Sequence, residues 1–123
     1  MEAVTVVMVA YGAEDWLERA VDAALASTDI DLDVVVVDNG CTDGGVQRVS
    51  HRERVTVVSP NENLGFAAGC NLGVRHARAA TIALVNCDAI VEPTALSALV
   101  RVAQRDEVGI ATAVCDSQPR RTR

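Results

Sequence analysis

The sequence predicts an α/β domain with an open, mainly parallel sheet of about five strands and helices on both faces. Five short apolar runs, rich in β-branched residues, alternate with segments whose apolar residues recur at helical spacing. The runs lack polar–apolar alternation, which is typical of parallel strands covered on both sides. Half of the 123 residues are hydrophobic but only three are aromatic. A core of Val, Ala, Leu and Ile suits layered α/β packing.

Residues 4–10 (VTVVMVA) form the first predicted strand, because they are almost all apolar and largely β-branched. Residues 14–26 then predict a helix, and the acids Glu14 and Asp15 suit its N-terminus. Strand and helix together make the first half of a βα unit. The apolar face of this helix is predicted to comprise Trp16, Leu17, Ala20, Val21, Ala24 and Leu25.

The second predicted strand, residues 34–37 (VVVV), ends at Asp38. The loop after it, NGCTDGG, is rich in residues that tolerate tight turns, and a short helix over residues 46–52 follows. Residues 55–58 form the third strand. The polar segment NENLGFAAGCNLG then leads into a helix that we expect to end near residue 79.

Residues 81–85 form the fourth predicted strand, and residues 108–114 (VGIATAV) form the last. Pro93 suits the first position of the helix between them, whose apolar stripe is Leu96, Leu99, Val100 and Ala103. Strands that alternate with helices imply right-handed crossovers in a parallel sheet. We expect one domain over residues 1–114 and a polar, disordered tail over residues 115–123.

Charge and missing motifs exclude several ligand classes. The chain has 17 acidic and 11 basic residues, and the bases are scattered until the tail, so it lacks the basic face that nucleic acid needs. It has no lysine, which excludes a P-loop and a phosphoacceptor receiver site. The segment AYGAED after the first strand has one glycine, where a dinucleotide fold needs G-x-G-x-x-G.

The four cysteines, Cys41, Cys70, Cys87 and Cys115, lie far apart and form no C-x-x-C pair. This spacing favours free thiols in a reducing compartment. The apolar run over residues 3–10 is too short to span a bilayer and lacks the layout of a signal peptide. We therefore expect a cytoplasmic protein, with peripheral contact to a membrane left open.

Polar residues follow three of the predicted strands. Tyr11 and Gly12 follow the first strand, Asp38 and Asn39 the second, and Asn86 and Asp88 the fourth. Open parallel sheets bind ligands beyond the carboxyl ends of their strands, so these residues are expected on one rim. Each one alone is explained equally well as a turn or helix-cap residue. Two acids on one rim favour a ligand site.

Three stretches, VDNGCTDGG, NENLGFAAGCNLG and ALVNCDAIVEP, occur in this order. In sequence and spacing they resemble the inverting, family 2 glycosyltransferases, which have the GT-A fold of nucleotide-diphospho-sugar transferases. Within that family they are similar to the rhamnosyltransferase-like members. The resemblance covers residues 4 to about 113. It implies the N-terminal, donor-binding part of an enzyme that binds a nucleotide diphosphate-sugar and transfers the sugar to a hydroxyl of an unknown acceptor.

The resemblance also implies roles for individual residues. Asp38 corresponds to an acid that contacts the nucleobase, and Tyr11 lies near the base. Glycines let backbone N–H groups approach phosphate at a helix N-terminus, which is the favoured role of Gly65 and Gly69; loop-to-helix packing is the alternative. The remaining residues implied to line the nucleoside and diphosphate region are Asn39, Asn63, Gly65, Phe66, Gly69 and Asn71.

Asp88 matches the last acid of the family's Asp-x-Asp motif, which implies a ligand for Mg²⁺ or Mn²⁺ at the diphosphate. Such hard ions prefer oxygen ligands, often one or two carboxylates completed by substrate phosphates and water. Asn86 replaces the first acid, and Cys87 stands where rhamnosyltransferase-like members often have proline. One carboxylate predicts weaker metal binding than two.

Members of the family continue for roughly another domain's length, which supplies the acceptor site and the carboxylate general base. We therefore expect a chain truncated before the acceptor site and assign no catalytic base. The motif VAYG also replaces the usual Thr/Ser-Tyr-Asn, so a side-chain contact to the nucleoside is expected to be missing at Ala10 and Gly12.

Two other classes stay open. One is a non-catalytic binding or assembly module, in which a second copy or a partner chain covers an open sheet edge and apolar surface near residues 108–114. The other is a different doubly wound mononucleotide binder. Nucleotide titration without sugar distinguishes this last class from a sugar transferase.

Overall fold

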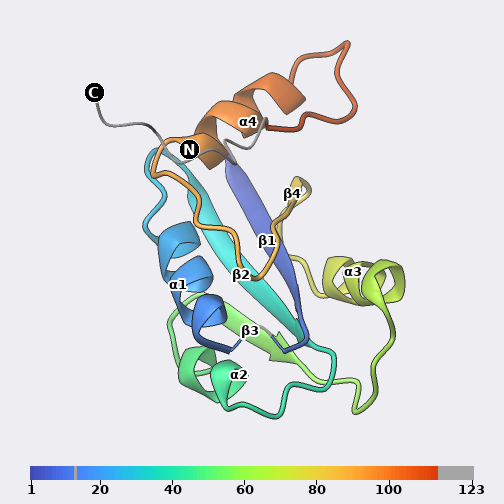
Figure 1. Ribbon diagram of the computed structural model, residues 1–123. Helices are drawn as coiled ribbons and strands as arrows, with labels where there is room; N and C mark the ends of the chain where they lie inside the picture. The colour runs from blue at the N-terminus through green and yellow to red at the C-terminus, as the bar shows by residue number, and fades with distance from the viewer. Residues whose placement is uncertain (13, 114–123) are drawn as a thin grey trace, which may run out of the picture.

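A computed structural model describes residues 1–12 and 14–113 (Figure 1). Its centre is a parallel sheet with the strand order β3-β2-β1-β4, which confirms the predicted fold class. Among the described residues, no helix has the length and apolar character needed to cross a membrane. The elements are β1 (Ala3–Ala10), α1 (Glu14–Leu25), β2 (Asp31–Asp38), α2 (Gly45–Val49), β3 (Val55–Val58), α3 (Phe66–Arg75), β4 (Ile82–Leu84) and α4 (Ala95–Ala103).

The two central strands set the position of the rim. β1 and β2 pair along their whole lengths, from Ala3 with Asp31 to Ala10 with Asp38. The backbone N–H of Asn39 donates to the Ala10 carbonyl (2.9 Å), so the two chains leave the sheet together. β4 is short and pairs only with Thr5 to Val7 of β1. The loops after these strands therefore open at the same edge of the sheet.

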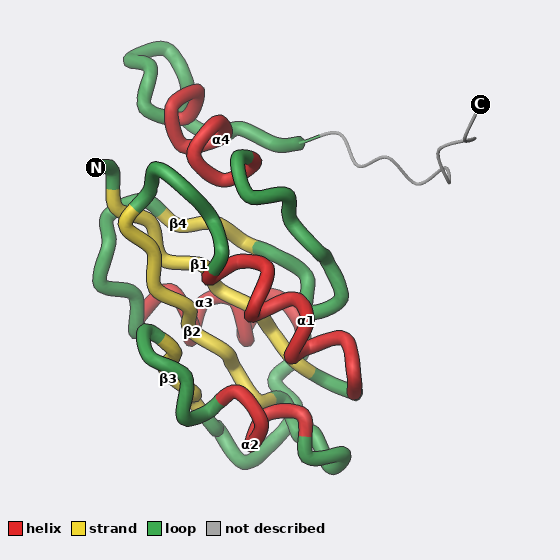
Figure 2. Tube along the Cα trace, turned by 90° about the vertical axis from the view of Figure 1, so that its left-hand side faces the viewer, coloured by secondary structure: helices red, strands yellow, loops and turns green. Residues whose placement is uncertain are grey.

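One face of the sheet carries the main core. Alternate side chains of β1 and β2 point to this face and are buried beneath α1, α2 and α4, while α1 and α2 lie in front of the sheet in Figure 2. The buried members from the strands are Val4, Val6, Met8, Ala10, Leu32, Val34 and Val36. Those from the three helices are Leu17, Ala20, Val21, Ala24, Val46, Val49, Leu96 and Val100.

The opposite face is covered by α3, which lies very close to the sheet. A Cβ atom added to Gly69 would lie 2.9 Å from a Val9 methyl group, and one added to Gly73 would overlap a methyl group of Val7. Real Cβ atoms do not approach so closely, so the two glycines are what allow this packing. α1 and α3 thus lie on opposite faces of the sheet, as predicted (Figure 1).

The fifth predicted strand, residues 108–114, is wrong for the part that the structure describes. Residues 108–113 form no strand, and Ile110 is 91 % exposed. A strand needs a neighbouring backbone to pair with, whereas this segment turns back beside α4, beyond the end of the sheet (Figure 1). Val114 and the predicted tail over residues 115–123 lie outside the described residues. An apolar, β-branched composition does not show whether a neighbouring strand is present.

Thr5 is a fully buried polar residue that joins three parts of the fold. Its hydroxyl donates to Asp33 Oδ1 (2.7 Å) and accepts the backbone N–H of Ala79 (3.1 Å). We expect Thr5→Val to lower the free energy of unfolding by about 1–3 kcal/mol, because the shape is kept while the Ala79 N–H loses its acceptor. Urea unfolding measures this loss, and Thr5→Ser, which keeps the hydroxyl, is the control. Equal losses in both variants would contradict the role of the hydroxyl.

Candidate functional site

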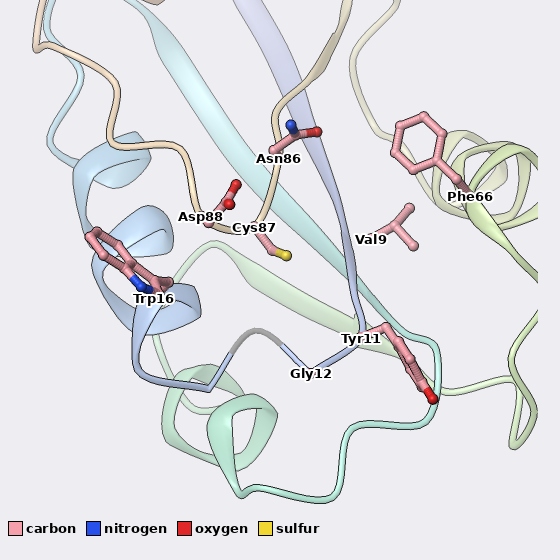
Figure 3. Close-up of a pocket in the computed structure, with 8 residues that line it drawn as sticks. All are labelled: Val9, Tyr11, Gly12, Trp16, Phe66, Asn86, Cys87 and Asp88. Atoms are coloured by element: carbon pink, nitrogen blue, oxygen red, sulfur yellow. The ribbon is translucent and has the colours of Figure 1, made fainter. Parts of the chain in front are cut away.

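A pocket of about 290 Å³ lies at the carboxyl rim of the sheet, between the loops after β1 and β4 and the first turns of α1 and α3 (Figure 3). A larger hollow of about 390 Å³ lies at the amino end, beside Met1 and Ser97, and contains none of the predicted site residues. The residues that line the rim pocket are Val9, Tyr11, Gly12, Trp16, Phe66, Asn86, Cys87 and Asp88.

Asp88 and Asn86 are the polar side chains that follow β4. Both are exposed and line the pocket, and a turn with the Ala89 N–H donating to the Asn86 carbonyl (3.0 Å) keeps them in one loop. Cys87 between them is half-buried. Burial, and secondarily the charge of Asp88, raises the pKa of the Cys87 thiol, so it stays protonated at neutral pH. The available ligand atoms at this rim are therefore carboxylate and amide oxygens.

This donor set can be tested against the predicted metal. Among residues 1–12 and 14–113, no group of three or more His, Cys, Asp or Glu side chains could hold a metal ion by itself. Mg²⁺ and Mn²⁺ are commonly held by one or two carboxylates together with phosphate oxygens and water. Asp88 and Asn86 fit that mode of binding, in which a phosphate ligand completes the coordination.

Asp38 shapes the turn after β2. Its Oδ1 atom accepts the backbone N–H groups of Gly40 (3.1 Å) and Cys41 (2.8 Å). The ring of Tyr11 lies against this turn, with its nearest carbon 3.8 Å from a Cβ built on Gly40. Asp38 does not line the pocket, and its contact with a nucleobase stays a prediction. The Cys41 thiol in the same turn has its pKa raised to about 11, mainly by burial.

Asn39 is buried and joins the end of β2 to the loop before α3. Its Nδ2 donates to the Gly65 carbonyl (3.0 Å), and its Oδ1 accepts the Leu64 N–H (3.4 Å). In the same loop, Asn63 Oδ1 accepts the N–H of Gly65, which has a positive φ of 79°. These contacts hold the start of α3 in place, so that Phe66 reaches the pocket.

We expect Asn39→Ala to lower the free energy of unfolding by about 1–3 kcal/mol, because the Leu64 N–H loses its acceptor and the Gly65 carbonyl keeps only the N–H of Gly69. The loop before α3 should loosen first. Hydrogen exchange measures this as a larger increase in amide exchange rate, relative to the wild type, at Leu64 than at Val35, which lies in the sheet. Uniform acceleration across both positions would contradict a local role for Asn39.

The structure brings four of the predicted site residues together: Tyr11, Phe66, Asn86 and Asp88 line the pocket. The other predicted residues lie outside its lining. Gly69 allows the close packing of α3 on the sheet, whereas nothing lies within 4 Å of a Cβ built on Gly65, whose carbonyl accepts from Asn39. Asn71 is exposed on α3. Besides Asn71, the predicted residues outside the lining are Asp38, Asn39, Asn63, Gly65 and Gly69.

Trp16 corrects a prediction. Its place among the apolar residues of α1 predicted a core residue, but its side chain is 49 % exposed and lines the pocket. The buried stripe of α1 begins at Leu17, and one residue corresponds to about 100° around a helix. The position of Trp16 in the sequence could have shown this, because a residue in the first helical turn after β1 lies at the carboxyl rim of the sheet. Sequence reasoning also missed Val9 and Cys87 as lining residues, whereas Gly12 was expected at the rim.

The fold and this pocket define the class of open α/β domains that bind ligands beyond the carboxyl ends of parallel strands. Comparison with known sequences is more specific. The model of glycosyl transferase family 2 matches residues 5–123, and the chain belongs to that family.

Among its relatives are the succinoglycan biosynthesis protein ExoO of Rhizobium meliloti (strain 1021) and a chondroitin synthase of Pasteurella multocida (strain Pm70). ExoO is 33 % identical over 113 residues, which cover 90 % of this chain and 32 % of ExoO. The chondroitin synthase is 28 % identical over 108 residues, which cover 85 % of this chain and 11 % of the synthase. The chain thus spans a third or less of the length of these relatives.

Solved structures agree with this assignment. The mannosyltransferase PcManGT of Pyrobaculum calidifontis, in complex with GDP-Man and Mn²⁺, has a TM-score of 0.78 and 29 % identity, covering 86 % of this chain and 33 % of that chain. Staphylococcus aureus TarS (residues 1–349) has a TM-score of 0.71 at 21 % identity and covers 84 % of this chain and 32 % of that one. The predicted GT-A fold is therefore confirmed.

Proposed function

We propose that the chain binds a nucleotide diphosphate-sugar together with Mg²⁺ or Mn²⁺, as the donor-binding part of an inverting sugar transferase. The observation that carries the proposal is the rim pocket, which Asp88 and Asn86 line together with the aromatic residues Tyr11 and Phe66. The likeness to a mannosyltransferase in complex with GDP-Man and Mn²⁺ supports it. We assign no acceptor-activating base to any residue of the chain.

Asp88 and Asn86 would hold the ion through their side-chain oxygens. The ion would supply charge stabilisation to the diphosphate as it leaves the sugar. The N-terminus of α3 adds a second attraction for phosphate, since the helix begins at Phe66 and has no side-chain cap. Uncapped N–H groups and the helix dipole both favour an anion there. Tyr11 and Phe66 offer apolar ring faces to the nucleoside.

We also propose that the chain is of the rhamnosyltransferase-like type within the family. This finer proposal rests on the stretch LVNCDA, in which Asn86 replaces the first acid of the motif. The inverting course of the reaction is part of the same proposal, and the resemblance of the three motifs supports it.

Calorimetric titration tests the main proposal. UDP-GlcNAc, GDP-mannose and dTDP-rhamnose are each added to the chain, with Mn²⁺ and then with EDTA. We expect at least one of them to bind in the presence of Mn²⁺ and to bind at least about 100-fold more weakly without it, since the ion would join the diphosphate to Asp88, the one carboxylate among the residues that line the pocket. No binding of any nucleotide, with or without its sugar, would overturn the proposal.

One observation favours the assembly-module alternative. β4 is an edge strand of the sheet, and Leu84 within it is 58 % exposed, with Ile90 nearby in sequence 51 % exposed. An open edge with apolar side chains can pair with the same edge of a second copy. Light scattering over a range of concentrations tests this. A dimer that Leu84→Lys dissociates supports the alternative, and a monomer at every concentration excludes it.

A further inference from the structure

We infer that Trp16 forms the wall of a subsite for the sugar of the donor, which rests on the proposed donor-binding function. Two features of the structure and one of the donor lead to this assignment. They are the placement of every aromatic ring of the chain, the faces of the sheet from which these rings come, and the order of groups within a nucleotide diphosphate-sugar.

The chain has one Trp, one Tyr and one Phe, and all three line the rim pocket. None of them is buried: Tyr11 is 64 %, Phe66 63 % and Trp16 49 % exposed. Large apolar side chains left in water forgo about 25 cal/mol for each Å² that burial would remove from solvent. Three rings exposed around one pocket, in a chain whose core contains no aromatic residue, therefore point to a ligand with ring faces to cover.

The three rings come from opposite faces of the sheet. Tyr11 continues the alternation of Val7 and Val9, which face α3, and Phe66 begins α3 itself. Trp16 lies in the first turn of α1, which covers the other face. In Figure 3 the loop with residues 86–88 lies between Trp16 on one side and Tyr11 and Phe66 on the other.

A nucleotide diphosphate-sugar has its diphosphate between the nucleoside and the sugar. With the diphosphate at Asp88 and the nucleoside toward Tyr11 and Phe66, the sugar is directed to the remaining side, where Trp16 lies. The pocket of about 290 Å³ is at the lower limit of small-molecule sites, so it suits the diphosphate and one adjoining ring rather than a whole donor. An indole face packs well against the C–H surface of a pyranose.

Arg19 supports this orientation of the indole. Its guanidinium carbon lies 5.3 Å from the centre of the Trp16 ring, and among the described residues it takes part in no ion pair. A cation over an exposed indole contributes about 0.5–1 kcal/mol, enough to bias the ring's orientation. The part of the Trp16 ring that Arg19 does not cover is available to line the pocket.

The test compares each nucleotide with its own sugar conjugate: UDP with UDP-GlcNAc, GDP with GDP-mannose, and dTDP with dTDP-rhamnose, all with Mn²⁺. In the pair that binds, we expect Trp16→Ala to weaken binding of the sugar conjugate roughly tenfold and to change binding of the bare nucleotide less than about twofold. Trp16→Phe should recover part of the loss. Arg19→Gln keeps the indole and removes only the cation over it, so it should lose less of the sugar contribution than Trp16→Ala does.

Tryptophan fluorescence gives a second readout, because Trp16 is the single tryptophan of the chain. With excitation at the red edge of indole absorption, the sugar conjugate with Mn²⁺ should change the emission of Trp16 more than the bare nucleotide does. Equal weakening of nucleotide and conjugate by Trp16→Ala would overturn the sugar subsite while leaving donor binding intact. Failure of the wild-type chain to bind any of the six compounds would instead overturn the proposed function and the subsite with it.

Discussion

Asp88→Ala is expected to weaken Mn²⁺-dependent binding of the nucleotide diphosphate-sugar by about 100-fold or more. Loss of a residue that merely supports a metal ligand commonly costs 10–100-fold, and Asp88 is the one carboxylate among the residues that line the pocket. A 100-fold loss corresponds to about 2.7 kcal/mol. The variant should stay folded, because Asp88 is exposed and takes part in no ion pair among the described residues.

Three further variants make the test specific. Asp88→Asn keeps the shape and removes the charge, and it should behave like the alanine variant. Asp31→Ala removes an exposed acid at the opposite end of β2 and should leave binding unchanged. Asn86→Asp restores the first acid of the Asp-x-Asp motif and should tighten Mn²⁺ binding, because a second carboxylate joins the first. Calorimetry with Mn²⁺ and EDTA measures all four, and unchanged binding in Asp88→Ala would contradict the metal site.

The rim itself could be predicted from the sequence, because parallel strands end at one edge. The structure confirms this: Ala10 pairs with Asp38, and the Val85 N–H donates to the Val7 carbonyl, so the loops after β1, β2 and β4 open together. The direction of each side chain could not be predicted. It depends on hydrogen bonds that form only in the fold, such as those that Asp38 accepts from Gly40 and Cys41.

Two predictions were wrong for the same physical reason: the composition of a segment does not say what its residues pack against. Trp16 has the character of a core residue, yet it lies one position away from the buried stripe of α1 that begins at Leu17. Residues 108–113 have the character of a strand but find no neighbouring backbone among the described residues. Asn39 is the opposite case: it is polar, but it is buried, because its side chain is hydrogen-bonded to the loop before α3.

Gly73→Ala should be the most destabilising change at the interface of α3 with the sheet. The added methyl group would overlap Val7 and come within 3.2 Å of a Val37 methyl group. Both valines are buried in the two central strands, so neither can move aside and α3 must shift as a whole. Overpacking costs roughly 1–3 kcal/mol, and an overlap with a buried side chain lies at the upper end of that range; helix propensity returns up to about 1 kcal/mol, which leaves a net loss of about 2 kcal/mol.

A double-mutant cycle separates overpacking from other causes. Val7→Ala removes the methyl groups that the new side chain meets, so Gly73→Ala should cost less in that background than in the wild type. Gly109→Ala is the control, because nothing lies within 4 Å of a Cβ built there. Urea unfolding measures the four stabilities of the cycle. Costs that add without coupling would mean that α3 yields to the extra methyl group, and the closeness of α3 to the sheet would then not depend on glycine at this position.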